Sequence, residues 1–259
     1  MLPSEVLLTE LVEPEWVVHS VLPRGNMVIL AGEPGAGKSY LMYYLAYAIA
    51  TNKPFLGYPT TPTKVLYFDE ENGDPDFLKY NQWAWRAHGA PEPSTLDSTL
   101  RLEHFSLLHG WIGPMRLIMK VFKPGLVIVD TATPAFHLAD ENDNAEANRV
   151  ISELRKIRQD ACPGATVIVL KHEKQRDDVQ HRRTIRGAKT WLGAFDQVLY
   201  HSKTRGAPKK DGTRRTVLEP DKLRAFGLRH PIGIDPCFES VDRKALILNP
   251  YSPKVESEE

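Results

Sequence analysis

Apolar runs alternate with segments of mixed polarity along most of the chain. Four continuous apolar runs are typical of buried strands: residues 26–31, 64–68, 126–129 and 165–170. Four other segments predict helices: residues 38–52, 77–88, 115–122 and 145–161. In the last of these, Val150, Ile151, Leu154 and Ile157 lie near helical spacing. Residues 102–105 predict one more short strand. Buried strands that alternate with helices predict an α/β fold with a mostly parallel sheet, covered by helices on both faces.

The pattern changes after about residue 197. The apolar runs 198–200, 215–219 and 245–248 follow one another without a helical segment between them. This arrangement predicts antiparallel strands at one edge of the sheet, toward the C-terminus. We therefore expect one domain at residues 24–250, an N-terminal arm at 1–23, and an acidic tail at 251–259 that is disordered.

Composition and charge exclude several classes of protein. Basic and acidic residues number 33 each, so the formal net charge is zero and contact with nucleic acid would need a local patch. No apolar run is long enough to span a membrane, and residues 1–10 lack the basic-then-apolar order of a signal peptide. Cys162 and Cys237 have no metal-ligand spacing. We expect both to be reduced, in a cytoplasmic protein.

The segment between the first strand and the first helix fits the phosphate-binding pattern G-x-x-x-x-G-K-[ST]. Its glycines let several N–H groups point at one phosphate. Lys38 would reach the β- and γ-phosphates, and the Ser39 hydroxyl would hold Mg²⁺. The strand–loop–helix setting argues against a turn without a ligand. ATP and Mg²⁺ are thus the predicted cofactors, and the predicted nucleotide-binding residues are Gly32, Glu33, Pro34, Gly35, Ala36, Gly37, Lys38, Ser39 and Tyr40.

Polar residues also follow the other predicted strands. Asp130 comes after residues 126–129, as in the Walker B pattern, and is expected to bind Mg²⁺ rather than cap a helix. Glu70 and Glu71 end another strand, where one carboxylate could orient or deprotonate water. Two solvated acids explain that pair almost equally well. His172 follows residues 165–170, where it could bind the γ-phosphate, although a lone histidine is usually structural.

These residues together resemble the RecA-like ATPases, specifically the group around RepA-type plasmid replicative helicases. The resemblance spans roughly residues 23–224. It rests on GEPGAGKS at 32–39, FLG at 55–57, VLYFDEE at 65–71, VDT at 129–131, DENDNAE at 140–146, KH at 171–172 and RG at 186–187. The acidic strand end and the DENDNAE stretch make it more specific than the phosphate loop alone.

The resemblance implies a RecA-like P-loop fold and a role for each matching residue. Lys38 binds phosphate, and Asp130 is the Walker B acid. Glu71, rather than Glu70, activates water, and His172 senses the γ-phosphate. The family often has two adjacent histidines at the last position, whereas this chain has Lys171 before His172.

The resemblance also implies a homo-oligomer, with a hexameric ring expected and the nucleotide bound between subunits. A neighbouring subunit then supplies a positive charge to the transition state. We expect Lys222 and Arg224, a K-x-R pattern, to supply it, with Arg186 next. Residues 203–205 form a competing K-x-R pattern, and a plain surface charge is the alternative for each.

Residues 171–186 form a polar stretch without apolar periodicity, and the resemblance places the DNA path along this segment. The predicted contacts are Lys171, Lys174, Arg176, Arg182 and Arg183. A solvated loop explains the stretch about equally well. No base-reading motif is present, so contact with single-stranded DNA would be independent of sequence.

We therefore expect an ATP-hydrolysing, ring-forming motor on single-stranded DNA, in plasmid or phage replication, with a primase or loader acting in trans. One alternative is a recombination mediator or filament-forming RecA-like ATPase. Another is a regulatory or accessory DNA-binding protein that binds ATP with little turnover. A small-molecule kinase has weak support, because no lid or acceptor pocket is recognisable.

Overall fold

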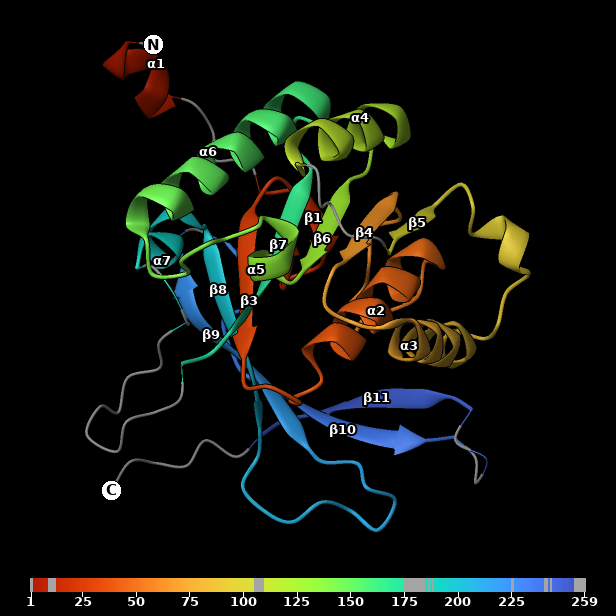
Figure 1. The fold of residues 1–259 in the computed structure, drawn as a ribbon. Helices are drawn as coiled ribbons and strands as arrows, with labels where there is room; N and C mark the ends of the chain where they lie inside the picture. Colours follow the sequence, from red (N-terminus) through yellow and green to blue (C-terminus); the bar gives the residue numbers. More distant parts are fainter. Residues whose placement is uncertain are drawn as a thin grey trace, which may run out of the picture.

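A nine-stranded sheet runs through the part of the chain that the computed structural model describes, in the order β11-β10-β9-β8-β3-β7-β6-β4-β5 (Figure 1). The structure describes residues 2–8, 13–104, 110–174, 185, 187, 189–224, 226–239, 242 and 244–253. The parallel part of the sheet comprises β3 (Met27–Gly32), β4 (Val65–Asp69), β5 (Leu100–Glu103), β6 (Leu126–Asp130), β7 (Thr166–His172) and β8 (Gln197–Lys203). The predicted mostly parallel α/β sheet is therefore confirmed.

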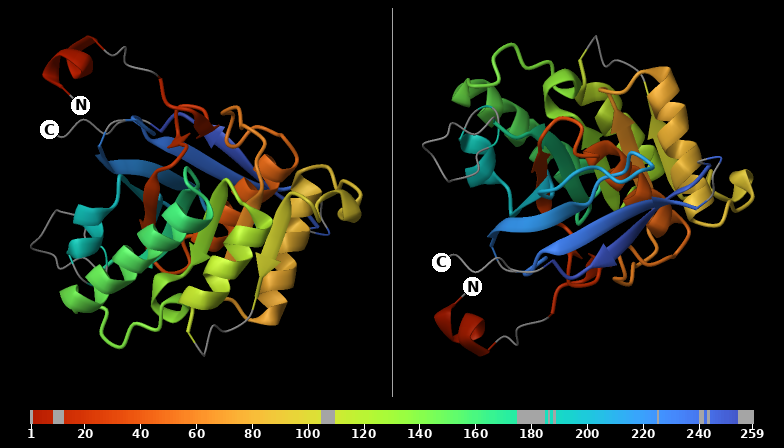
Figure 2. Two further views of the ribbon diagram at one scale, coloured as in Figure 1. Left: turned by 90° about the horizontal axis from the view of Figure 1, so that it is seen from above. Right: turned by 90° about the horizontal axis from the view of Figure 1, so that it is seen from below.

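Helices cover both faces of the parallel part (Figure 2). One face carries α2 (Lys38–Ala50) and α3 (Asp74–Ala87), and the other carries α4 (Ile112–Phe122), α5 (Ala132–Ala135), α6 (Asn144–Ala161) and α7 (Thr190–Ala194). Side chains alternate between the two faces along each strand, so Val28 and Leu30 pack with α2 while Ile29 packs on the side of α6. Both faces of these strands are buried, which explains why they are continuous apolar runs.

The burial of α2 and α6 follows their sequences. Helix α2 is buried on nearly all sides, because α3 and the C-terminal strand β11 (Leu246–Tyr251) lie on the side away from the sheet. Helix α6 is amphipathic, and its four predicted apolar side chains are buried. It begins after Asp143, whose side chain accepts a hydrogen bond from the Ala145 N–H at 2.7 Å.

The C-terminal strands differ in part from the prediction. Strand β8 lies inside the sheet and runs parallel to β3. The antiparallel part consists of β9 (Thr216–Leu223), β10 (Ile232–Phe238) and β11. Strand β9 continues beyond the predicted end at residue 219, past Pro220, because an irregular register opposite residues 198–199 accommodates the proline. Strand β10 was not predicted, since Gly233 and Pro236 interrupt its apolar pattern.

The predicted N-terminal arm has two structurally different parts. Helix α1 (Pro3–Leu8) stands apart from the body in both figures. Strands β1 (Trp16–Val18) and β2 (Leu22–Pro23) form a small hairpin whose Val17, Val18, Val21 and Leu22 are buried in the main core. Residues 16–23 thus pack as part of the main body. Of the predicted tail, residues 254–259 lie outside the described residues.

Candidate nucleotide site

The phosphate loop connects the carboxyl end of β3 to the first turn of α2, as predicted. Gly35 and Gly37 adopt positive φ angles of 69° and 90°, and Gly37 is the residue that precedes the helix. At Gly32 a Cβ atom would lie 2.2 Å from the carbonyl oxygen of His201 on β8. Close packing against the neighbouring strand therefore explains the first glycine of the motif, and backbone conformation explains the other two.

Lys38 is folded back into the phosphate loop. Its Nζ donates hydrogen bonds to the carbonyl oxygens of Gly32 at 3.0 Å and Glu33 at 3.1 Å. Burial lowers the pKa of Lys38, while the nearby carboxylates of Glu71 and Asp130 act in the opposite direction. The ammonium group thus lies inside the loop, close to the predicted water-activating Glu71 and the predicted Mg²⁺ ligand Asp130.

Asp130 ends β6 beside the first turn of α2, and its side chain is fully buried. The Tyr67 hydroxyl donates to its Oδ2 at 2.9 Å. The pKa of Asp130 is raised to about 7, first by burial and then by the charge of Asp69, while hydrogen bonds with Ser39 and Tyr67 lower it. A bound cation would relieve this crowding of buried negative charge.

The donor set at Asp130 and Ser39 fits Mg²⁺ bound together with a nucleotide. Proteins usually hold Mg²⁺ through one or two carboxylates, with phosphate oxygens and water completing the octahedron. One carboxylate and one hydroxyl meet that requirement. Within the described ranges, no group of three or more His, Cys, Asp or Glu is placed to hold a metal ion. A cage built from protein side chains alone is therefore not found there.

Asp69 is a site residue that the sequence analysis missed. It ends β4 directly opposite Asp130 in the strand register and is 1% exposed. Its Oδ2 accepts a hydrogen bond from the Tyr43 hydroxyl at 2.5 Å. Its Oδ1 accepts hydrogen bonds from the backbone N–H groups of Glu71 and Asn72 at 3.2 and 3.0 Å. The available signal was an acid at a strand end one residue before the glutamate pair.

Glu71 and His172 meet at this edge of the sheet. Glu71 Oε1 lies 3.3 Å from His172 Nε2, although Glu71 follows β4 and His172 ends β7, on either side of β6. The hydrogen bond from His172 lowers the pKa of Glu71, with a further contribution from the charge of Lys38. Glu70 donates its backbone N–H to the Asp130 carbonyl at 2.7 Å. The structure thus brings Glu71, Lys38, Asp130 and His172 together around the phosphate loop.

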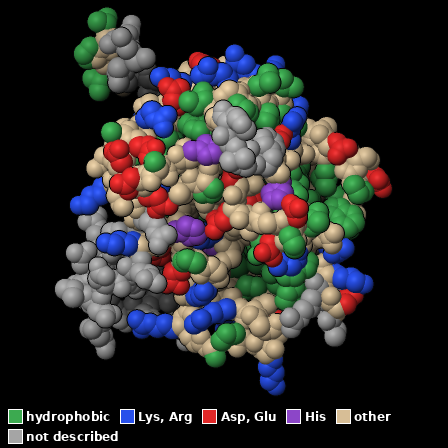
Figure 3. Space-filling view, in the orientation of Figure 1, with side chains coloured by type: hydrophobic (Ala, Val, Ile, Leu, Met, Phe, Trp, Pro, Cys, Tyr) green, Lys and Arg blue, Asp and Glu red, His purple; other side chains and the backbone are tan. Residues whose placement is uncertain are grey.

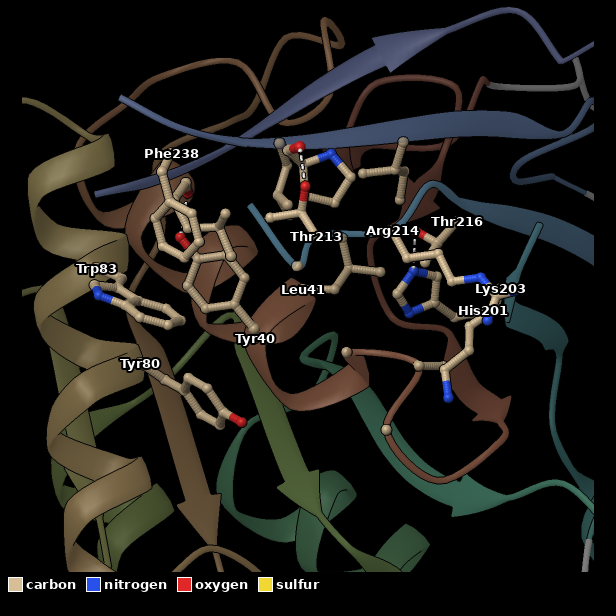
Figure 4. Close-up of a pocket in the computed structure, with 18 of the residues that line it drawn as sticks. Tyr40, Leu41, Tyr80, Trp83, His201, Lys203, Thr213, Arg214, Thr216 and Phe238 are labelled. Atoms are coloured by element: carbon tan, nitrogen blue, oxygen red, sulfur yellow. Dashed lines mark hydrogen bonds between the residues drawn. The ribbon is translucent and has the colours of Figure 1, made fainter. Parts of the chain in front are cut away.

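Acidic and histidine side chains gather in the middle of the face drawn in Figure 3. A cavity of about 450 Å³ lies next to the phosphate loop (Figure 4). Its walls come from the loop, from α2 and α3, from the β8–β9 connection and from β10 and β11. Tyr40, Tyr80, Trp83 and Phe238 form an aromatic wall, and His201 lies on the other side. No pattern in the sequence indicated this cavity, because its walls come from segments far apart along the chain.

The proposed trans-acting cations are held by their own chain. Lys222 Nζ donates to the carbonyl oxygens of Leu192 and Phe195, each at 2.6 Å, and Arg224 donates to that of Gly193 at 2.8 Å. Both residues thereby stabilise the C-terminal end of α7. Arg186 lies outside the described residues. In the competing pattern, Lys203 Nζ donates to the Pro34 carbonyl at 3.2 Å, so that lysine contacts its own phosphate loop.

The predicted DNA segment is only partly described. Lys171 is 2% exposed, with Nζ 4.5 Å from the centre of the Trp191 ring, so the expected DNA contact by Lys171 is wrong for this conformation. The error arose because Lys171 continues β7 and points into the layer of α7. Lys174 is exposed. The remaining predicted contacts, Arg176, Arg182 and Arg183, lie outside the described residues.

Comparisons with known proteins agree with this architecture. The profile of the family described as AAA domain matches residues 2–178. No curated protein matches the sequence significantly. The crystal structure of a KaiC-like protein from the hyperthermophilic archaeon Pyrococcus horikoshii OT3 is similar, with a TM-score of 0.58 and 14% identity over 90% of this chain and 94% of that chain. At this identity the similarity concerns the fold, and it confirms the predicted RecA-like architecture. No helix among the described residues is long and apolar enough to cross a membrane.

Proposed function

Because the chain belongs to the AAA domain family and has a RecA-like P-loop fold, we propose that it hydrolyses ATP and moves along single-stranded DNA as a ring-shaped motor. The observation that carries the ATPase part is the convergence of Lys38, Asp130, Glu71 and His172 at one edge of the sheet. The DNA-motor part extends the resemblance seen in the sequence.

Each residue of this cluster has a role that its contacts support. Lys38 would exchange its two carbonyl partners for phosphate oxygens. Ser39 and Asp130 would hold Mg²⁺, which neutralises charge on the phosphate oxygens when bound. Glu71 keeps a carboxylate available as an acceptor for the proton of the attacking water, because its pKa is lowered. His172, in contact with Glu71, would register whether the γ-phosphate is present.

The cavity beside the loop supports a nucleoside triphosphate as the ligand. Its volume of about 450 Å³ is in the range typical of small-molecule sites. Aromatic side chains on one wall offer flat apolar surface to a base. Tyr40, which was predicted to bind the nucleotide, lies in this wall, and its hydroxyl donates a hydrogen bond to the Leu246 carbonyl. The phosphates and the base would thus have adjoining but separate binding surfaces.

Support for DNA as the track comes from the chain that follows His172. The exposed Lys174 lies two residues beyond the predicted γ-phosphate sensor, at the start of the polar stretch. Loss of the γ-phosphate could therefore alter the position of a segment that meets a phosphate backbone. A ring of identical subunits, hexameric by resemblance, would bring several such segments to one channel, with a primase or loader supplied in trans.

One observation favours a second candidate, an ATP-binding switch or accessory protein with little turnover. Glu71 is already engaged by His172. If that contact persists when ATP is bound, Glu71 is not free to activate water. A nucleotide-dependent switch would then be the result, without a motor cycle.

The test is ATP turnover with Mg²⁺, measured with and without single-stranded DNA, together with the mass of the assembly by light scattering. Lys38→Ala and Glu71→Gln are the paired variants, because the first should abolish nucleotide binding and the second should retain binding but lose turnover. DNA-stimulated turnover in a ring-sized assembly supports the motor. Tight ATP binding with negligible turnover, unchanged by DNA, refutes the motor and supports the switch.

A further inference from the structure

Two stacked tyrosines lie beside the buried acids Asp69 and Asp130. Tyr43 comes from α2 and Tyr67 from β4, and both are fully buried. Their ring centroids are 4.2 Å apart and their planes are inclined by only 7°. The Tyr43 hydroxyl donates a hydrogen bond to Asp69, and the Tyr67 hydroxyl donates one to Asp130. Each tyrosine thus donates a hydrogen bond to one member of the buried acid pair.

The acid pair needs such donors. Asp69 and Asp130 face each other on adjacent strands, and both are almost completely removed from water. Buried like charges repel one another, and hydrogen-bond donors are the means of stabilising them. Burial raises the pKa of both tyrosines well above their ordinary value, so each hydroxyl keeps its proton and remains a donor at neutral pH.

Asp69 in turn fixes the turn that carries Glu71. Its Oδ1 accepts the N–H groups of Glu71 and Asn72, and the Asn72 side-chain amide donates to both carboxylate oxygens at 3.1 and 2.9 Å. The backbone at Glu71 is therefore anchored to a side chain rather than to a neighbouring strand. The Tyr43 hydroxyl donates a hydrogen bond to that side chain from α2.

Tyr43 connects this turn to the phosphate loop. It lies four residues after Ser39 on α2, the helix that begins at the loop. A continuous series of contacts thus runs from α2 through the Tyr43 hydroxyl and the Asp69 carboxylate to the Glu71 backbone, and from the Glu71 side chain to His172.

We propose that Tyr43 and Asp69 are positioning residues, which set the place of the water-activating Glu71 relative to the phosphate loop. The inference rests on the proposed ATPase function and adds residues to which neither the sequence motifs nor the resemblance assigned a role. Both act through Glu71. Removing the Tyr43 hydroxyl should therefore slow hydrolysis without weakening nucleotide binding.

The matched pair of variants is Tyr43→Phe and Tyr47→Phe. Tyr47 lies one turn further along the same helix and is buried. Its hydroxyl donates a hydrogen bond to Asn81 at 3.2 Å, away from the acids. Both changes keep the ring and delete one buried hydroxyl. We expect Tyr43→Phe to lower kcat by between about 10- and 100-fold, the range expected for a misplaced catalytic group. The Kd for a non-hydrolysable ATP analogue should stay within about twofold, and Tyr47→Phe should change neither quantity.

Two further measurements separate positioning from general destabilisation. In a double-mutant cycle, Tyr43→Phe should not lower further the residual kcat that remains, in single-turnover measurements, after Glu71 is replaced by Gln, because both changes remove the same function. Amide hydrogen exchange of Glu71 and Asn72 should be faster in Tyr43→Phe than in Tyr47→Phe. The exchange measurement does not depend on turnover.

The outcomes are distinguishable. If the wild-type protein shows no turnover, the proposed ATPase function fails and exchange alone decides the positioning inference. Equal exchange of the Glu71 and Asn72 amides in the two tyrosine variants overturns the inference. In a protein that hydrolyses ATP, an equal loss of kcat in both variants, or an additive effect in the Glu71→Gln background, also overturns it.

Discussion

Replacing Lys171 by Met should stabilise the protein at neutral pH. Lys171 Nζ is buried over the Trp191 ring and has no hydrogen-bond partner among the described residues. Burial lowers the pKa of Lys171 to about 8, and the charge of Glu141 opposes the shift only in part. A charged lysine in this environment is costly at pH 7, where both the folded and the unfolded chain hold its proton.

The size of the effect follows from the pKa. The pKa of Lys171 falls from the ordinary lysine value of 10.5 to about 8, and each pKa unit corresponds to about 1.4 kcal/mol, so the buried charge costs about 3 kcal/mol at pH 7. Loss of the cation–π contact with Trp191 removes about 1 kcal/mol of this gain. Methionine has a similar length and no charge. We therefore expect Lys171→Met to raise the free energy of unfolding by about 2 kcal/mol.

The sign of the pH dependence distinguishes this explanation from simple repacking. Between pH 8 and 10.5 the unfolded chain binds the Lys171 proton more strongly than the folded chain, so wild-type stability from this group rises with pH. The Met variant lacks that rise. The difference between the two proteins should shrink across this interval and be small near its upper end.

The assay is urea unfolding at pH 7 and at pH 10. The control is Lys174→Met, the same substitution at an exposed position of the same segment. It should change stability by less than about 0.5 kcal/mol at both pH values. A Lys171→Met protein that is less stable than wild type at pH 7, or a stability difference that does not vary with pH, refutes the reasoning.

Three other predictions follow from the same structure. The pKa values of His88 and His201 fall to about 4 and about 3 through burial, so only the unfolded chain binds their protons as the pH drops from about 6.5. Urea titrations should therefore show stability falling by up to about 1.4 kcal/mol per pH unit for each histidine; constant stability between pH 6 and 4.5 would contradict this. Gly32→Ala should destabilise the fold by about 1–3 kcal/mol in thermal unfolding, because its Cβ meets the His201 carbonyl, whereas Gly113→Ala, with open space around it, should not. Lys222→Met should lower the free energy of unfolding of the unassembled chain by about 1–3 kcal/mol in urea, since it strands carbonyl groups at the end of α7; an unchanged value would mean that those hydrogen bonds contribute nothing.

Local patterns were sufficient for the central part of the fold. The buried parallel strands are continuous apolar runs because helices cover both of their faces. Such runs can be recognised in the sequence without knowledge of the tertiary structure. The phosphate loop was equally clear, since Gly35 and Gly37 are required by backbone conformation. The proximity of Asp130 and Lys38 followed from one rule, that the carboxyl ends of parallel strands meet at the same edge.

The remaining features depend on contacts between distant residues. Strand β10 contains a glycine and a proline, so only its pairing with β9 and β11 defines it. Asp69 resembles any strand-end acid until the register sets it against Asp130. Lys171 reads as part of a basic loop, and only the fold shows that β7 continues through it toward Trp191. In each case the information lies in the partner, which is 61 residues away for Asp69 and 20 residues away for Lys171, rather than in the segment itself.

The walls of the cavity beside the phosphate loop come from two different parts of the chain. The groups proposed to handle phosphate and Mg²⁺ all lie within residues 2–178, the part that matches the family profile. Much of the opposite wall comes from residues 201–248, beyond that match. The walls of the chamber therefore draw on both stretches of sequence, whereas the groups of the proposed reaction draw on the first alone. Under the proposed function, substitutions in the C-terminal strands can reshape the chamber while the reacting end stays intact, so two proteins of this architecture can diverge in what they accept without diverging in how they cleave it.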